Sequence, residues 1–187
     1  MNLPNKLTTF RIFLIPIFIL VLELNILDES IFKTTQKMVL AATIFAIASI
    51  TDFLDGKIAR KRKLITNFGK FADPLADKLL VMTALIFLTY FSIVPAWITS
   101  IIVIRELAVT GLRTLIVENN GKVLAAQWPG KIKTFTQMFA IIFLYTNNFG
   151  LSMPIGQILI YLAVFFTIYS GFDYFYQNKN VFNDGLK

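Results

Sequence analysis

The sequence contains four aspartates at spacings that suit metal binding. Asp52 and Asp55 are three residues apart, and Asp73 and Asp77 are four apart. Residues three or four apart lie on one face of an α-helix. Each pair would therefore present two carboxylates in the same direction if its segment is helical.

Four neighbouring carboxylates near a membrane interface repel one another, and a bound cation removes that repulsion. Carboxylate oxygens favour hard ions, which means Mg²⁺ or Mn²⁺ for catalysis and Ca²⁺ as a competitor. Two such ions suit phosphoryl transfer because they stabilise both the attacking and the leaving oxygen. The pattern therefore predicts a site for two divalent metal ions.

The residues around the first aspartate pair suit a phosphate ligand. Gly56 and Ala59 fall on the same helical stripe as Asp52 and would let a bulky ligand approach the backbone. Arg60 lies about one turn beyond Gly56, where a guanidinium group can meet a phosphate. We therefore expect the metal site to be joined to a phosphate-binding surface.

Structural roles explain parts of this pattern. Asp73 before Pro74 is typical of a helix N-cap, Asp55-Gly56 is typical of a turn, and Gly56 and Ala59 suit close helix packing. None of these roles explains why one pair of aspartates precedes the basic loop and a second pair follows it. We therefore favour metal binding, with which capping by Asp73 is compatible.

Composition indicates that the helices carrying these aspartates lie in a membrane. Of the 187 residues 56% are hydrophobic and 16% are charged, and the mean hydropathy is +0.68. The net charge of +7 suits anionic lipid headgroups, and its basic residues lie between apolar runs, which argues against a nucleic-acid partner. The sequence has no Cys or His, which excludes thiol and imidazole chemistry and the usual zinc sites.

Six apolar segments predict an all-α, polytopic membrane protein with six transmembrane helices in a single domain, residues 1–187. Only helices and closed barrels satisfy their backbone in lipid, and the alternation of barrel strands is missing. The first segment contains Arg11 and Pro16 and no cleavage site follows it, so we expect no cleaved signal. The segments are Leu7–Leu27, Met38–Leu54, Leu79–Val94, Ala96–Val117, Thr134–Asn147 and Ile155–Phe175.

Basic residues predict that both termini and the aspartates face the cytoplasm. With six spans, the side opposite the termini would contain only two basic residues, Lys33 and Lys37. A loop over Lys61–Ala72 would let the second and third helices lie antiparallel and bring the four carboxylates together. The other side receives Lys6, Arg11, Lys57, Arg60, Lys61, Arg62, Lys63, Lys70, Arg113, Lys122, Lys131, Lys133, Lys179 and Lys187.

A second group of charges predicts an anion-binding site. Arg105 and Glu106 lie inside the fourth apolar segment, where charge is costly, and Arg113 falls near the same helical face. Lys131 and Lys133 open the fifth segment. Internal pairing of Arg105 with Glu106, and the positive-inside rule for the lysines, are the simpler explanations. We favour a role for all four cations in binding the phosphate of an acceptor.

The aspartate stretch resembles the CDP-alcohol phosphatidyltransferase family. It matches the family signature D-x2-D-G-x2-A-R-x8-G-x3-D-x3-D, from Asp52 to Asp77, at every fixed position. The resemblance implies six transmembrane helices, a homodimer and a two-metal site. It implies metal binding by all four aspartates, with Asp77 also the base, and a site for CDP-diacylglycerol at Asp52, Gly56, Ala59, Arg60 and Gly69.

Three other segments, around Pro4–Arg11, Ile104–Glu106 and Gly130–Thr134, resemble bacterial members that use sn-glycerol 3-phosphate as the acceptor. The implied products are phosphatidylglycerophosphate and CMP, at the inner (cell) membrane of a bacterium. Inositol phosphate and phosphatidylglycerol remain alternative acceptors within the family. A divalent-cation transporter and a non-catalytic lipid-binding protein are the alternatives outside it.

Overall fold

The computed structural model describes residues 2–24, 30–31, 34–62, 67–118 and 128–182, and nearly all of them are helical. Two short strands, β1 (Ser30–Ile31) and β2 (Thr34–Thr35), pair antiparallel between the first two helices. Short 3₁₀ turns, η1 and η2, cover Asn147–Gly150 and Lys179–Phe182. The helices are α1 (Leu3–Glu23), α2 (Gln36–Arg62), α3 (Asn67–Tyr90), α4 (Ala96–Glu118), α5 (Trp128–Tyr145) and α6 (Ile155–Gln177). The predicted all-α class and all six predicted helices are confirmed.

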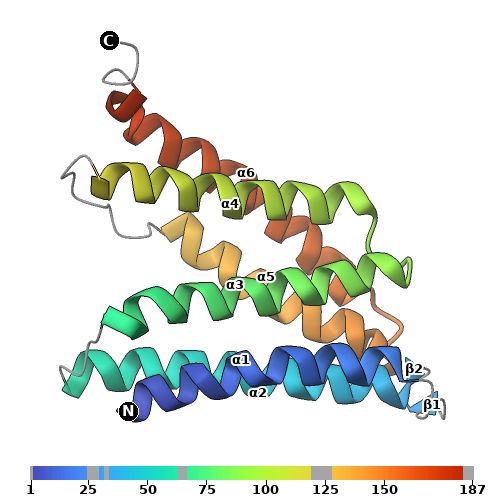
Figure 1. Ribbon diagram of the computed structural model, residues 1–187. Coiled ribbons are helices and arrows are strands. Elements are labelled where there is room, and N and C mark those ends of the chain that lie inside the picture. The colour runs from blue at the N-terminus through green and yellow to red at the C-terminus, as the bar shows by residue number, and fades with distance from the viewer. Residues whose placement is uncertain (1, 25–29, 32–33, 63–66, 119–127, 183–187) are drawn as a thin grey trace.

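Successive helices run in opposite directions, so α1 begins and α6 ends at the same end of the bundle (Figure 1). The last turns of α2 and α4 and the first turns of α3 and α5 also lie there. We call it the site end, because it receives the residues that the sequence singled out. The predicted antiparallel arrangement of α2 and α3 is confirmed.

The bundle core is apolar and contains buried residues from all six helices. Phe18 is fully buried, and its ring packs edge-on against Tyr145, with 5.7 Å between the centroids. The Tyr145 hydroxyl donates a hydrogen bond of 2.9 Å to the carbonyl of Ala84, which links α5 to α3. Ala41, Ala48, Ala76 and Ala84 are all fully buried, and their small side chains let the helices approach closely.

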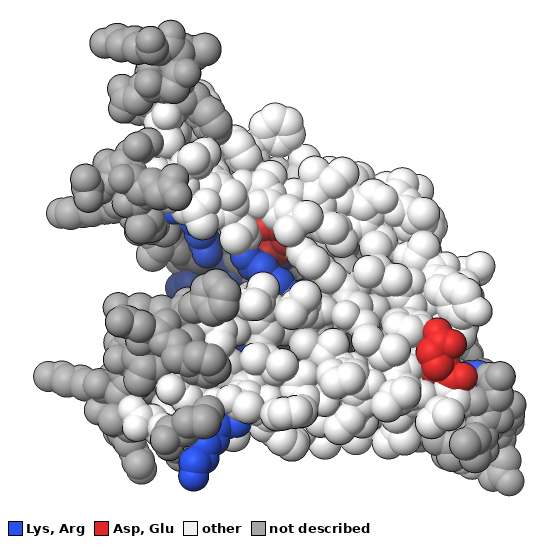
Figure 2. All heavy atoms as spheres, viewed as in Figure 1, with Lys and Arg blue, Asp and Glu red and all other residues white. Residues whose placement is uncertain are grey.

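The outer surface is also apolar, as expected for a membrane protein. Phe13, Phe53 and Phe172 are each more than 60% exposed, and charge is sparse over the face in Figure 2. Three helical stretches, in α1, α2 and α6, are long and apolar enough to cross a bilayer: Pro4–Glu23, Gln36–Leu54 and Ile155–Gln177. The helices α3, α4 and α5 contain the charges of the candidate site, which lowers their hydropathy.

Several predicted boundaries were wrong. The predicted loop Lys61–Ala72 is largely helical, because α2 continues to Arg62 and α3 begins at Asn67. Asp73 therefore lies inside α3 and is not its N-cap. Apolar runs mark where a helix meets lipid, whereas backbone hydrogen bonding continues into polar sequence beyond it. For the same reason α5 begins at Trp128, before the predicted Thr134.

Gly156 tests how tightly α6 packs on α5. A Cβ atom at Gly156 would lie 3.0 Å from the backbone nitrogen of Leu144, whereas one at Gly111 on α4 would meet nothing within 4 Å. We expect Gly156→Ala to destabilise the protein by about 1–3 kcal/mol. The matched Gly111→Ala should be neutral or stabilising by up to about 1 kcal/mol. Unfolding midpoints in detergent measure both, and equal effects would contradict the close packing.

Candidate active site

The aspartates of α2 and α3 are contacted by a buried polar face of α1. Arg11 is fully buried, and its Nη1 lies 2.8 Å from Oδ1 of Asp52. Its Nε also donates a hydrogen bond of 3.3 Å to the carbonyl of Ala48. A buried guanidinium group needs such a counter-charge, so this pair fixes α1 against α2.

Thr8 makes the corresponding contact to α3. It lies three residues before Arg11, on the same face of α1, and is fully buried. Its hydroxyl donates a hydrogen bond to the carboxylate of Asp73. The first helix thus orients one carboxylate from each of the other two helices.

Asp77 lies one turn beyond Asp73 on α3 and is partly buried. The negative charge of its carboxylate is opposed by that of Asp52 on α2. Gly56 is partly buried on α2 and Gly69 is buried near the start of α3. The side chains of Asp55, Ala59 and Arg60 fall outside the described residues.

These residues fit divalent metal ions by the chemistry of their donors. Asp52, Asp73 and Asp77 offer only carboxylate oxygens, which Mg²⁺ and Mn²⁺ prefer. The repulsion between Asp52 and Asp77 is the kind that a cation relieves. Among the described residues, however, no three acidic side chains converge closely enough to form a metal site by themselves.

A cavity of about 230 Å³ connects Asp77 to the second predicted group of charges. The sequence placed Arg105, Arg113 and Lys133 in an acceptor site, and all three line this cavity together with Asp77. Lys131 does not line it, and its Nζ lies 5.6 Å from the centroid of the exposed Trp128 ring. The structure therefore brings three of the four predicted cations to Asp77, the predicted base.

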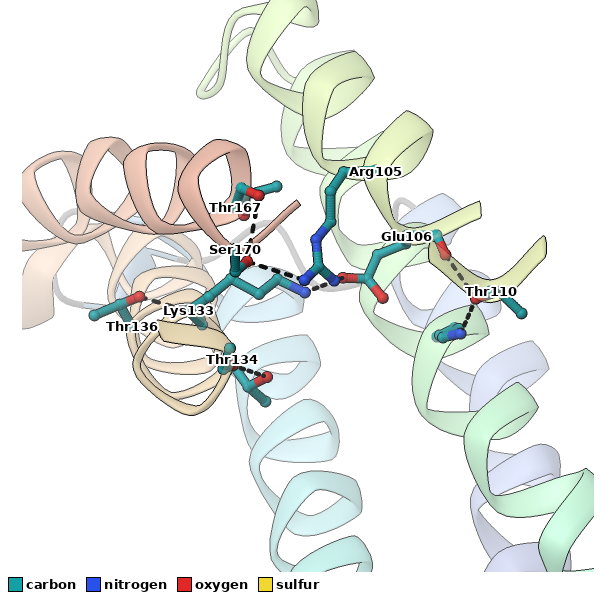
Figure 3. Close-up of polar contacts among 10 residues, drawn as sticks. Arg105, Glu106, Thr110, Lys133, Thr134, Thr136, Thr167 and Ser170 are labelled. Carbon is teal, nitrogen blue, oxygen red and sulfur yellow. Dashed lines mark hydrogen bonds and ion pairs between the residues drawn. The ribbon is translucent and has the colours of Figure 1, made fainter. Parts of the chain in front are cut away.

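Glu106 is the centre of the ion pairs in this cavity (Figure 3). Its carboxylate accepts hydrogen bonds from Nη1 of Arg105, at 3.1 Å, and from Nζ of Lys133. Nη2 of Arg105 donates a further bond of 2.9 Å to the hydroxyl of Ser170 on α6. This network joins α4, α5 and α6 at the cavity wall.

Lys78 is a cavity residue that the sequence analysis did not identify. Its Nζ donates a hydrogen bond to the hydroxyl of Thr110, which in turn donates one of 2.6 Å to the backbone carbonyl of Glu106. Two signals in the sequence pointed to Lys78: it directly follows Asp77, and it is a cation at the start of an apolar run that begins with Leu79.

The comparison with known families agrees with this geometry. The model of the CDP-alcohol phosphatidyltransferase family matches residues 1–169. The chain belongs to this family. Its helical, largely apolar structure and its family together identify it as a membrane protein.

Similar proteins include a CDP-diacylglycerol–glycerol-3-phosphate 3-phosphatidyltransferase of Bacillus subtilis (strain 168), 48% identical over 187 residues and 95% of each chain. A protein of Rickettsia felis with the same name is 39% identical over 185 residues and 97% of each chain. A probable phosphatidylglycerophosphate synthase of Mycobacterium tuberculosis (strain H37Rv) is 38% identical over 173 residues, which cover 92% of this chain and 79% of the relative.

The charges in the cavity of this family member favour an anion. Four cations, Lys78, Arg105, Arg113 and Lys133, face the two carboxylates of Asp77 and Glu106, which leaves a formal charge of +2 (4 − 2). The charged side chains gather in a recess of an otherwise mostly uncharged face (Figure 2). Nε of Arg105 and Nε of Arg113 are buried and have no hydrogen-bond partner within the described ranges. Buried donors of this kind are suited to an anionic ligand.

Glu106→Gln tests the central ion pairs, because it keeps the side-chain shape and removes the negative charge. The side chains of Lys133 and Glu106 are only 8% and 13% exposed, so we expect uncompensated cations to cost on the order of 3 kcal/mol. The thermal unfolding midpoint in detergent should fall by several degrees. Adding Lys133→Met should recover part of the loss, and strictly additive losses would show that the two side chains do not interact.

Proposed function

We propose that this protein is a phosphatidylglycerophosphate synthase. It transfers the phosphatidyl group from CDP-diacylglycerol to sn-glycerol 3-phosphate and releases CMP. The observation that carries the proposal is the single cavity that joins Asp77 to Lys78, Arg105, Arg113 and Lys133. The names of the similar proteins support the same reaction.

The aspartate half of the site binds the nucleotide and the metals. Asp52, Asp55, Asp73 and Asp77 would hold two divalent ions, Mg²⁺ or Mn²⁺. Such ions would supply positive charge to stabilise the negative charge of the diphosphate. CDP-diacylglycerol is bound beside them by Asp52, Gly56, Ala59, Arg60 and Gly69.

The cationic half of the site binds the acceptor. A phosphate monoester carries about −1.5 to −2 charges at pH 7, which matches the formal +2 of the cavity. Arg105, Arg113 and Lys133 hold this phosphate, and the buried Nε donors of the two arginines favour it over a neutral alcohol. Lys131, exposed on the first turn of α5, stays a predicted fourth contact.

Asp77 is the base of the reaction, because it lines the same cavity as the cations that hold the acceptor. It takes the proton from the 1-hydroxyl of glycerol 3-phosphate. The oxygen then attacks the phosphorus that bears diacylglycerol, the bond from this phosphorus to the CMP oxygen breaks, and CMP leaves with the bonding electrons. Positioning of the two substrates supplies much of the rate.

The protein crosses the membrane of a bacterial cell six times as one domain, residues 1–187, with both termini and the site end in the cytoplasm. The excess of Lys and Arg at the site end supports this orientation. A groove of about 470 Å³ between α4 and α6, lined by Ile104, Phe172 and Phe175 among others, supports sideways exit of lipid chains into the bilayer. The active form is a homodimer, as in the family that the sequence resembles.

The function is tested by CMP release from CDP-diacylglycerol in detergent micelles. With Mg²⁺ or Mn²⁺ present, we expect release with glycerol 3-phosphate, but not with inositol phosphate, serine or phosphatidylglycerol. A chelator should abolish it. Asp77→Asn should abolish turnover and leave nucleotide binding measurable, because it removes the base but keeps the side-chain shape.

Each other outcome changes a different part of the proposal. Turnover with another acceptor alone would overturn the assigned acceptor and keep the aspartate chemistry. Wild-type rates for Asp77→Asn would remove Asp77 from the mechanism. No release with any acceptor from well-folded protein would favour divalent-cation transport instead.

Substitutions at Lys133 and Lys131 distinguish a specific role in acceptor binding from a general effect of positive charge. Lys133 lines the cavity and is buried, whereas Lys131 is exposed beside Trp128. We expect Lys133→Met to raise KM for glycerol 3-phosphate at least tenfold, as for loss of a charged hydrogen bond. Lys131→Met should raise it less. Equal effects of the two substitutions would show that the cavity does not select between them.

A further inference from the structure

A smaller cavity of about 60 Å³ continues inward from the acceptor site. Asp77, Lys78, Glu106, Lys133 and Thr134 line both cavities. The inner one lies about one helical turn deeper, because it adds a residue four positions from a shared one on each helix. These additions are Val81 on α3, Ile102 on α4 and Gln137 on α5.

Gln137 is the polar residue that the inner cavity adds. Its side chain is buried, with 3% of the residue exposed, and the other added residues are Val81, Met82, Ile102 and Met138. The side-chain oxygen Oε1 has no hydrogen-bond partner in the described part of the chain. A buried acceptor without a donor costs free energy, so it is suited to a ligand that donates a hydrogen bond.

The nearby donors are engaged with other acceptors. The hydroxyl of Thr134 donates to the carbonyl of Gly130, and Nζ of Lys133 donates to Glu106. Nζ of Lys78 donates to Thr110. Each lysine ammonium has three N–H donors, and in the proposed complex the remaining ones serve the phosphate of the acceptor. A hydroxyl group of the acceptor, next to the base Asp77, is then the donor that suits Oε1 of Gln137.

From this geometry we infer that Gln137 selects the acceptor by accepting a hydrogen bond from its second hydroxyl. The inference rests on the proposed function. The cations hold the phosphate, Asp77 receives the proton of the reacting 1-hydroxyl, and Oε1 of Gln137 accepts the hydrogen bond of the 2-hydroxyl. A cavity of about 60 Å³ accommodates a group of this size, since a water molecule needs only about 10–15 Å³ of cavity volume measured in this way.

The test compares glycerol 3-phosphate with 3-hydroxypropyl phosphate, which keeps the reacting hydroxyl and the phosphate and lacks the 2-hydroxyl. We expect wild-type protein to prefer glycerol 3-phosphate in kcat/KM by about tenfold or more. Gln137→Met has a similar side-chain length and no amide acceptor, and should reduce that preference to near one. A purely structural role would lower kcat/KM for both compounds equally.

Gln177→Met is the matched control, because Gln177 is exposed on α6 and bonds Asp173. It should keep the wild-type preference. If Gln137→Met does not fold, Gln137→Asn withdraws the carbonyl by one methylene and should also reduce the preference.

Three outcomes overturn the inference. A wild-type protein that does not distinguish the two compounds, or a Gln137 variant that keeps the full preference, overturns the role of Gln137 and leaves the proposed function intact. No turnover of glycerol 3-phosphate by wild-type protein overturns the proposed function and this inference with it.

Discussion

Glu106 holds Arg105 and Lys133 together at the place where α4, α5 and α6 meet. In a bundle with an apolar core and an apolar outer surface, an unpaired charge is costly, so these side chains must find partners within the protein. That requirement joins Arg105 and Glu106 of α4 and Lys133 of α5 in one network. This network forms part of the wall of the cavity beside Asp77, which Lys78 and Arg113 also line.

The cost of an unpaired charge also explains the contacts of Arg11 on α1. A single arginine in an apolar helix is costly in lipid. Arg11 is fully buried, and it forms an ion pair with Asp52 and a hydrogen bond to the carbonyl of Ala48. Thr8, on the same face, donates a hydrogen bond to the carboxylate of Asp73. Although α1 contributes none of the predicted metal ligands, it sets the position of carboxylates on both α2 and α3. In the proposed enzyme, α1 is therefore a positioning element for the metal site.

The two halves of the site differ in how they are organised. The cationic half is paired internally and keeps its surplus of positive charge, so it is ready for an anion. The aspartate half contains carboxylates that repel one another, and among the residues described no three of them gather as a metal site. Asp77 is common to both halves, which places the proposed base between the nucleotide side and the acceptor side.

Much of the fold and part of the site were predictable from local sequence. Apolar runs identified all six helices, since a long apolar segment has few other stable forms in lipid. The spacing of Arg105 and Arg113 predicted a shared face, and both line one cavity, because helical periodicity is local. The boundaries near Arg62 and Asn67 were not predictable from hydropathy, which reports contact with lipid and not where backbone hydrogen bonding ends.

The sequence alone determined the family signature, the helical class and the residue types available for chemistry: carboxylates, cations and no imidazole or thiol. Only the tertiary structure decided which of these residues meet. Arg11 pairs with Asp52, Lys133 and not Lys131 enters the cavity, and Lys78 and Gln137 join the acceptor side. Such contacts depend on how helices far apart in the chain pack and rotate against one another. Helical periodicity shows which residues share a face of one helix, but not which helix that face contacts.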